Sequence, residues 1–319
     1  MNKKERSFKF NSLRELGILI AFLVVLAILM ILSPKAFAKP ANLINILKQA
    51  SINGILATGM MFVIISGGID LSVGSIVALS GVIAASFAHP GEYPLIFPIT
   101  LSILAGLGAG FFNGIAVAFG NIPPFIVTLG SMTIIRGLAL IYSKGQPIFG
   151  VTKEFENIAG GFVLEKIPHL VIYFLGVTII SAFILTKTVF GRRVYAVGGN
   201  EVAAKVSGVG VPRIKISVYS ISGFLAGIAG LLLASRIVSG NPTAGNSYEL
   251  DAIAAVIIGG VSMTGGSGKW FGTVIGALFI AVISNGLDIL NVSSYFQLLI
   301  KGAIIIIAVL LDIKGKSRG

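Results

Sequence analysis

Six polar side chains lie within or beside long apolar stretches of the sequence and could take part in ligand chemistry. They are Asn53, Asp70, Ser72, Ser75, Asn113 and Asn285. Amides and hydroxyls donate and accept hydrogen bonds, as an uncharged polyol requires, so we expect these side chains to line a path for such a solute. Two plainer explanations stay open. Amides in apolar helices often bond to a neighbouring helix, and Asp70 could cap the helix after a tight turn at Gly67–Gly74.

Residues that would support enzymatic chemistry are scarce. The sequence has no cysteine, and its two histidines, His89 and His169, lie next to prolines at the borders of apolar stretches. This excludes disulfides and thiolate chemistry, and it leaves no set of side chains typical of a metal site or of an intramembrane enzyme. We therefore expect no metal, no cofactor and no catalytic residue.

A glycine-rich segment, Gly265–Lys269, imitates the phosphate-binding loop of nucleotide-binding proteins. Trp270 stands where that loop needs Ser or Thr for magnesium, and Met263 stands where its first glycine belongs. The segment also joins two apolar stretches rather than a strand and a helix. We infer that the chain has no nucleotide site, so energy for its work comes from a partner subunit or from an ion gradient.

The longest hydrophilic stretch inside the apolar sequence runs from residue 187 to residue 215 and is rich in Lys and Arg. At its centre Asn200 is a favourable N-cap, Glu201 suits the positive end of a helix dipole, and Gly208 can adopt the left-handed conformation that ends a helix. A helix of about seven residues is marginal alone. Its small side chains, Ala203 and Ala204, suit a surface that lies against another protein. The segment is therefore a candidate docking element, with an ordinary solvated loop helix as the alternative.

Composition places the chain in a membrane. Hydrophobic residues make up 55% of it and charged residues 11%, whereas soluble domains carry about 25% charged residues. This predicts an all-α, polytopic helical bundle. The net charge of +12 could suit nucleic acid, but the basic residues lie in loops between apolar stretches rather than on one polar face. We therefore expect the protein to interact with a lipid membrane and not with nucleic acid.

Apolar stretches near the length of about 20 residues that crosses a bilayer predict about ten transmembrane helices. They cover Leu16–Leu32, Ile46–Ser66, Leu71–Ala88, Leu95–Phe119, Phe125–Tyr142, Pro168–Thr186, Ile216–Ser235, Leu250–Val261, Trp270–Leu290 and Tyr295–Leu311. The eighth is short for a full crossing. The first follows a basic tail and lacks the usual cleavage site, which favours a retained helix over a cleaved signal peptide.

The distribution of Lys and Arg predicts the orientation. With ten spans, most of them fall on one side: in an N-terminal tail at 1–15, in the loop at 187–215, at Lys269 and in a C-terminal tail at 312–319. The positive-inside rule assigns that side to the cytoplasm, so both termini are expected inside. We expect residues 1–319 to form a single transmembrane domain.

Two stretches of the sequence resemble each other weakly. Val63–Ser75 is similar to Val256–Ser267 with one gap, and an Asn-Gly pair follows in each half, at Asn113 and at Asn285. This pattern predicts two weakly repeated halves with a pathway at their interface, as in many transporters.

The segment Gly67–Ser75, which reads Gly-Gly-Ile-Asp-Leu-Ser-Val-Gly-Ser, resembles the permease subunit of bacterial ABC importers for monosaccharides, most closely those for ribose. Three further stretches match in the same order, namely Tyr195–Glu201, Pro242–Val256 and Asn285–Leu287. The resemblance covers nearly the whole chain. It implies a bacterial inner-membrane location, a second copy of the permease in a homodimer, a cytoplasmic ATP-binding subunit and an extracytoplasmic sugar-binding protein.

In that family the loop containing Asn200 corresponds to the coupling helix that inserts into the ATPase. The resemblance thus implies a role in ATPase coupling for Gly199, Asn200, Glu201, Ala203, Ala204, Lys205 and Gly208. It implies import of a monosaccharide, with ribose the leading expectation, by alternating access powered by the separate ATPase. An ion-gradient-driven secondary transporter of a small polar solute is the alternative, with Asp70, Asp251 and Asp288 as the acids available to it.

Charged side chains inside apolar stretches need a partner or water. For Arg136 we expect snorkelling, or pairing with a carboxylate or a backbone carbonyl, and for Lys301 we expect snorkelling. Glu249 and Asp251 fall in the first turn of a predicted helix, where compensation of the helix dipole explains them. A contact with the sugar-binding protein is the alternative for these two acids.

Overall fold

The computed structural model describes residues 3–317, with the side chains of residue 17 and residues 19–310. Predictions for residues 1–2 and 318–319, and for the side chains of both predicted tails, lie outside the described residues. The elements in chain order are α1 (Lys3–Leu32), α2 (Pro34–Phe37), α3 (Pro40–Ile65), α4 (Val73–Ser86), α5 (Ile96–Phe119), α6 (Pro124–Tyr142), α7 (Lys153–Gly160), β1 (Phe162–Val163), β2 (Ile167–Pro168), α8 (His169–Lys187), α9 (Val189–Gly199), α10 (Glu201–Val206), α11 (Val211–Ile237), α12 (Tyr248–Ile258), α13 (Trp270–Ile289) and α14 (Ser294–Ser317).

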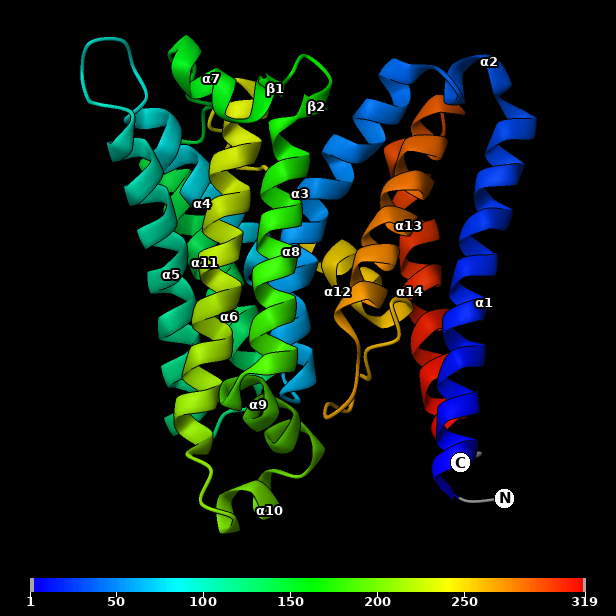
Figure 1. The fold of residues 1–319 in the computed structure, drawn as a ribbon. Helices are drawn as coiled ribbons and strands as arrows, with labels where there is room; N and C mark the ends of the chain where they lie inside the picture. The colour runs from blue at the N-terminus through cyan, green and yellow to red at the C-terminus, as the bar shows by residue number, and fades with distance from the viewer. Residues whose placement is uncertain (1–2, 318–319) are drawn as a thin grey trace.

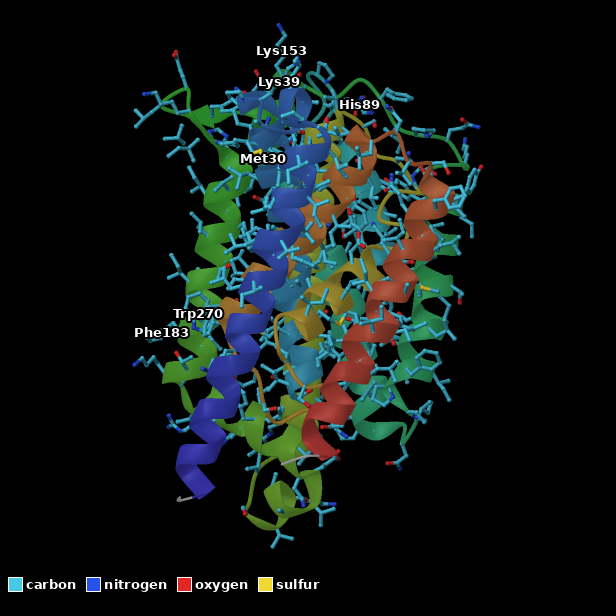
Figure 2. All side chains as sticks on the ribbon, turned by 90° about the vertical axis from the view of Figure 1, so that its right-hand side faces the viewer. Met30, Lys39, His89, Lys153, Phe183 and Trp270 are labelled. Carbon is cyan, nitrogen blue, oxygen red and sulfur yellow. The ribbon has the colours of Figure 1, made fainter. Side chains whose placement is uncertain are left out.

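The long helices stand side by side along one direction, with the short elements gathered at the two ends of the bundle (Figure 1). The short helices α2 and α7 and the antiparallel β1–β2 pair lie at one end, where Figure 2 also shows Lys39, His89 and Lys153. The opposite end holds α9, α10, the beginning of α1 and the end of α14. The beginning of α1 and the end of α14 therefore lie on the side of the bundle that contains the basic 187–215 loop.

Six described helices are long and apolar enough to cross a membrane: α3, α5, α6, α8, α11 and α13. Shorter apolar helical stretches cover Leu19–Leu32 in α1, all of α4, and Ser294–Leu310 in α14. The stretch predicted as the eighth span forms only α12, whose 11 residues extend about 16 Å, roughly half of the 30 Å hydrocarbon core. α12 cannot cross a bilayer as a helix alone.

Helix starts follow local sequence signals. Proline occupies the first turn of α3, α6 and α11, where its missing N–H is not needed and its fixed φ angle suits the helix. α1 begins at Lys3 and α14 ends at Ser317, so most of both predicted tails continues the neighbouring helix.

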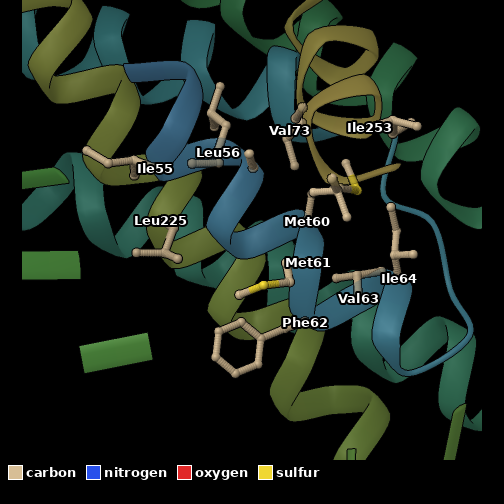
Figure 3. Packing of buried hydrophobic residues seen from close by; sticks show 14 of the residues in the cluster. Ile55, Leu56, Met60, Met61, Phe62, Val63, Ile64, Val73, Leu225 and Ile253 are labelled. Atoms are coloured by element: carbon tan, nitrogen blue, oxygen red, sulfur yellow. The ribbon is translucent and has the colours of Figure 1, made fainter. Parts of the chain in front are cut away.

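α3 forms the centre of the bundle. All its residues from 50 to 65 are buried, and Met60, Met61 and Phe62 pack among residues such as Leu225 and Ile253 of other helices (Figure 3). Apolar faces of a membrane helix can contact lipid, but burial on every side requires neighbouring helices all around. The neighbours of α3 include α8, α11, α12 and α13.

α5 and α11 pack through glycines. Gly106 and Gly110 of α5 face Gly223 and Gly227 of α11, and a Cβ added at Gly106 would lie 2.6 Å from the Cα of Gly227. Small residues at this spacing let two helix backbones approach directly, as is common in membrane helix pairs.

The helices α3 and α12 end in the same way. After each, a glycine adopts a φ of 87°, Gly67 in one case and Gly260 in the other. The next N–H donates to the carbonyl five residues back, from Gly68 to Val63 at 3.0 Å and from Val261 to Val256 at 3.1 Å. Both are Schellman turns, so the two similar stretches of sequence share this local geometry.

The elements after these two turns differ. α4 separates the first turn from α5, which carries Asn113, whereas α13, which carries Asn285, directly follows the second turn. Asn113 and Asn285 therefore do not occupy equivalent places, and that part of the expected correspondence was wrong. The reason for the difference is that α4 lies between α3 and α5, whereas no helix lies between α12 and α13.

Candidate functional site

The predicted docking segment forms a short helix with the expected ends. Asn200 caps α10 by accepting a hydrogen bond from the Ala203 N–H at 2.9 Å. Gly208 has a φ of 79°, and the Val209 N–H donates to the Ala204 carbonyl at 3.0 Å, which closes a Schellman turn. Glu201 forms an ion pair with Lys215 of α11 at 2.8 Å, but both side chains reach solvent, so the pair contributes little stability.

The side chains of α10 point in directions that the sequence did not indicate. Ala204 is only 5% exposed and packs against its own chain, whereas Val202 and Val206 are 74% and 85% exposed. Ala203, Lys205 and Gly208 are also exposed. The expectation that Ala204 offers a surface to a partner was therefore wrong, because it faces inward in the short helix. The spacing of Val202 and Val206, four residues apart, was the signal that could have found the outer apolar face.

α10 is connected to the bundle through close glycine contacts. Gly198 packs directly on the Ile65 carbonyl at the end of α3. That carbonyl accepts a hydrogen bond from the Gly266 N–H at 2.8 Å, and a Cβ added at Gly266 would lie 2.5 Å from the Cα of Gly199. The end of α3, the end of α9 and the loop after α12 therefore meet backbone to backbone, in what we call the glycine junction. The segment that imitates a phosphate loop is part of this junction.

Tyr195 of α9 adds a side-chain link to the glycine junction. Its hydroxyl donates to the Gly268 carbonyl at 2.9 Å. Burial raises the pKa of the Tyr195 phenol, which keeps the hydroxyl protonated and able to donate.

A pocket of about 330 Å³ opens beside the glycine junction. Its lining includes Gly67, Gly199, Asn200, Glu201 and Tyr219. The Tyr219 hydroxyl donates to the Ile69 carbonyl at 3.1 Å. The volume is in the range of small-molecule sites, and its walls join the docking segment to the ends of the long helices.

Three of the predicted pathway residues come together in a buried network. Asp70 accepts hydrogen bonds from Ser72, through its N–H at 3.0 Å and its hydroxyl at 2.6 Å, and from the Ser222 hydroxyl at 2.8 Å. The Asn113 amide donates to the Ser72 hydroxyl at 2.8 Å. Asp70, Ser72 and Asn113 are completely buried. The network joins the start of α4 to α5 and α11 inside one chain, so these groups serve packing here, as amides in apolar helices often do.

The other predicted pathway residues lie elsewhere. Asn285 of α13 and Asn42 of α3 exchange two hydrogen bonds, at 2.8 and 3.0 Å. Asn53 is buried in α3, and the buried Ser75 hydroxyl has no hydrogen-bond partner among the described residues. The six predicted residues therefore form no common lining within one chain.

The charged residues inside the bundle have identifiable partners. The Arg136 Nη1 donates to the carbonyls of Pro242 at 2.7 Å and Ala244 at 2.9 Å, which confirms pairing with backbone carbonyls. Lys301 does not snorkel but forms an ion pair with Asp251 at 2.8 Å. Glu249 and Asp251 lie in the first turn of α12 as expected.

The two histidines lie at the end of the bundle that holds α7. The Nδ1 of His89 is 3.2 Å from the Gly150 carbonyl, and the Nδ1 of His169 is 3.0 Å from the Asn157 carbonyl. Each ring is thus engaged with a loop or helix-end carbonyl. Among the described residues no three His, Asp or Glu side chains gather in a way that could hold a metal ion.

Residues 42–309 match the family model described as the branched-chain amino acid transport system / permease component. The chain belongs to this permease family. It is accordingly a multi-pass inner-membrane protein whose relatives are named as transport permeases. No solved structure matches it.

Individual relatives of this permease align over nearly their full length. It is 46% identical to the ribose import permease protein RbsC of Bacillus subtilis, over 95% of this chain and 94% of that protein. Identity to the ribose import permease protein RbsC of Escherichia coli K12 is 43%, over 97% of each chain. The D-allose transport system permease protein AlsC of Escherichia coli K12 is 40% identical, over 91% of this chain and 88% of that protein.

Proposed function

We propose that this permease imports ribose as the membrane-spanning subunit of an ATP-driven importer. The main support is that the sequence is 43–46% identical to ribose import permeases over more than nine-tenths of the chain. The alternative of a carrier driven by an ion gradient needs membrane-buried acids that are free to bind the ion. Here Asp70 is hydrogen-bonded to two serines, Asp251 is paired with Lys301 and Asp288 accepts from Gln297, which favours the importer.

The proposed membrane arrangement has ten crossings, with α9, α10 and both termini in the cytoplasm. Its support is the gathering of these elements at one end of the bundle together with the positive-inside rule. α4 and α12 are too short to cross alone, so adjoining non-helical segments complete their crossings. Membrane transporters commonly place such broken helices beside the pathway.

The proposed link to ATP hydrolysis is α10, which docks on a cytoplasmic ATP-binding subunit. Its exposed outer face carries Val202, Ala203 and Val206, and an apolar patch on a charged cytoplasmic loop suits a protein partner. Asn200 and Gly208 form the two ends of this helix, Gly199 packs in the glycine junction, and Ala204 anchors the helix inward. Glu201 and Lys205 are exposed beside the outer face.

The glycine junction provides the path by which movement of α10 reaches the membrane. Backbones in direct contact transmit displacement without the slack of long side chains, because packed interiors resist compression. A push on α10 would therefore move the end of α3 and the loop after α12 together. Both lead to the short helices α4 and α12, so we infer that alternating access reorients these broken crossings.

The complete importer contains two copies of this permease, the ATP-binding subunit and an extracytoplasmic sugar-binding protein that delivers the monosaccharide. The chain itself guides the sugar without changing it. The binding protein would dock at the end of the bundle that carries α2, α7 and the β1–β2 pair, because the ATPase occupies the other end.

Reconstitution tests the proposal. The permease, the ATPase and the sugar-binding protein would be purified together and placed in liposomes, and ATP hydrolysis and sugar uptake would be followed. Ribose should stimulate both activities only when all three proteins are present. Uptake by the permease alone, driven by an imposed proton or sodium gradient, would instead establish the secondary-transporter alternative.

A further inference from the structure

The segment between α11 and α12 runs through the depth of the bundle without helical structure. Gly240 packs near the end of α4, where a Cβ added to this glycine would lie 2.7 Å from the Cβ of Ala85. Gly245 packs on the beginning of α4, where an added Cβ would lie 2.5 Å from the Gly74 carbonyl oxygen. These two contact points on α4 are roughly 16 Å apart along the helix. Residues 240–245 therefore descend about half the thickness of the hydrocarbon core.

Two polar side chains in this part of the chain are exposed. Thr243 and Asn246 are exposed, whereas the intervening Gly245 and the preceding Pro242 are buried. The Thr243 hydroxyl donates to the Asn241 amide oxygen at 2.8 Å, which leaves its oxygen open to a donor. Non-helical backbone with exposed polar groups does not face lipid at membrane depth; it faces protein or water. One side of this segment faces α4, so its exposed side requires an aqueous or protein cover.

Arg136 of α6 supplies hydrogen-bond donors beside this segment. Its two hydrogen bonds to the carbonyls of Pro242 and Ala244 both use Nη1. In the part of the chain that the structure describes, Nε and Nη2 make no hydrogen bond, and the side chain is half-buried. The N–H groups of Nε and Nη2, which we call the free edge of Arg136, are therefore available as hydrogen-bond donors.

We propose that Thr243, Asn246 and the free edge of Arg136 form a subsite for the hydroxyl groups of an uncharged monosaccharide crossing the membrane. Amide, hydroxyl and guanidinium groups together match the mixed donors and acceptors of a sugar. The subsite rests on the proposed function, since it needs a sugar that passes through the membrane. It differs from the six residues expected from sequence, which are enclosed within the chain.

Cysteine labelling in the complete importer tests the subsite, because the chain has no native cysteine. Thr243→Cys and Asn246→Cys would be compared with Ile179→Cys, which replaces an exposed apolar side chain on the outer face of α8. A water-soluble methanethiosulfonate should label the first two at least about tenfold faster, since only a thiolate in contact with water reacts. Ribose at saturation should slow this labelling, and labelled importer should lose uptake.

Each result has a defined meaning. Labelling at 243 and 246 as slow as at 179 would show that lipid or the second permease copy covers the segment, and the subsite would be rejected. Fast labelling with neither protection by sugar nor loss of uptake would also reject it. Protection by another neutral monosaccharide, but not by ribose, would support the subsite and overturn the ribose assignment. The comparison of positions 243, 246 and 179 without sugar does not depend on transport, so it still tests the exposure of the segment if ribose stimulates no hydrolysis.

Asn246→Leu and Asn246→Gln separate sugar contact from a structural role. The Leu variant should assemble normally and require about tenfold more sugar for half-maximal uptake, since a group that donates and accepts is lost. The Gln variant should recover part of that loss. Equal behaviour of both variants and the native importer would remove Asn246 from the subsite.

Discussion

Val202 and Val206 are the most exposed apolar side chains of the proposed coupling helix. They are one helical turn apart, so they form one face of α10. Ala204 lies on the opposite face and is buried against the chain. A bulky replacement such as Ala204→Trp would therefore disturb the loop itself, and loss of ATPase binding in that variant would not identify an interface.

The double variant Val202→Asp/Val206→Asp should lose binding to the ATPase. Full burial of a valine in an interface contributes about 1.5–3 kcal/mol, so removal of both should weaken association by more than about a hundredfold. A pull-down of the ATPase with membrane-extracted permease measures this. Val163→Asp, at an exposed valine in the β1–β2 pair at the opposite end, is the control and should bind normally. Undiminished binding of the double variant would exclude α10 as the docking element.

The ion pair between Asp251 and Lys301 joins α12 to α14. The two side chains are 5% and 17% exposed, so neither charge is well hydrated. Because a lone charge at such a site has few favourable interactions, the two residues depend on each other. The effect of a substitution at either residue therefore depends on the side chain at the other.

Lys301→Met should destabilise the permease by about 3–5 kcal/mol, because it leaves the Asp251 carboxylate unpaired. The double variant Asp251→Leu/Lys301→Met should recover most of this loss. Thermal unfolding in detergent would compare the variants, with Lys215→Met as the control, because its pair with Glu201 is exposed and contributes about 1 kcal/mol or less. A double variant less stable than Lys301→Met would contradict the unpaired-charge explanation.

At the scale of elements, the contact between α5 and α11 depends on the absence of side chains. A Cβ added at Gly110 would lie 2.9 Å from the Cα of Gly223, whereas one added at Gly108 would meet nothing within 4 Å. The two glycines are on the same helix but face opposite directions. Only the first determines how closely the helices approach.

Gly110→Leu should lower the free energy of unfolding by about 1–3 kcal/mol or more, because the added side chain can be accommodated only if the two helices separate. Gly108→Leu should change stability little. The comparison would use thermal unfolding and size-exclusion profiles of the two variants in the same detergent. Equal effects would mean that glycine flexibility, and not the close approach, matters in α5.

At the scale of the whole molecule, the short elements divide between two ends. α9 and α10 share one end with the beginning of α1 and the end of α14, and the β1–β2 pair lies at the other. Between them the bundle has the apolar surface of a membrane protein, with exposed Ile179 and Phe183 on α8 and exposed Ile134 and Ile141 on α6. The two ends therefore face different compartments.

Single cysteines should report which compartment each end faces. Ser207→Cys, next to α10, should be protected from an impermeant thiol reagent in intact spheroplasts and should react after the membrane is opened. Leu164→Cys, at an 83% exposed position in the β1–β2 connection, should react in both conditions. These expectations follow from the positive-inside rule. Reaction at Ser207→Cys from outside would reverse the proposed orientation.

The sequence by itself determined the position of the long helices and the local form of the proposed coupling segment. Predicted spans Leu95–Phe119, Phe125–Tyr142 and Trp270–Leu290 agree with α5, α6 and α13 to within one residue at each end. Crossing a bilayer requires a continuous apolar length, and this requirement is visible along the chain. The N-cap at Asn200 and the left-handed Gly208 were also predictable, since hydrogen bonds between near neighbours in sequence form them.

Only the tertiary structure decided which side chains meet. Asn113 bonds to Ser72, Asn285 to Asn42, and Lys301 to Asp251. Each partner belongs to a different part of the chain, and helical periodicity predicts the face of a residue without predicting which element covers that face. The same is true of Ala204, which its own chain buries, and of Thr243 and Asn246, which are exposed in the segment before α12. The burial or exposure of these residues depends on how several helices pack together, and a single stretch of sequence does not determine that packing.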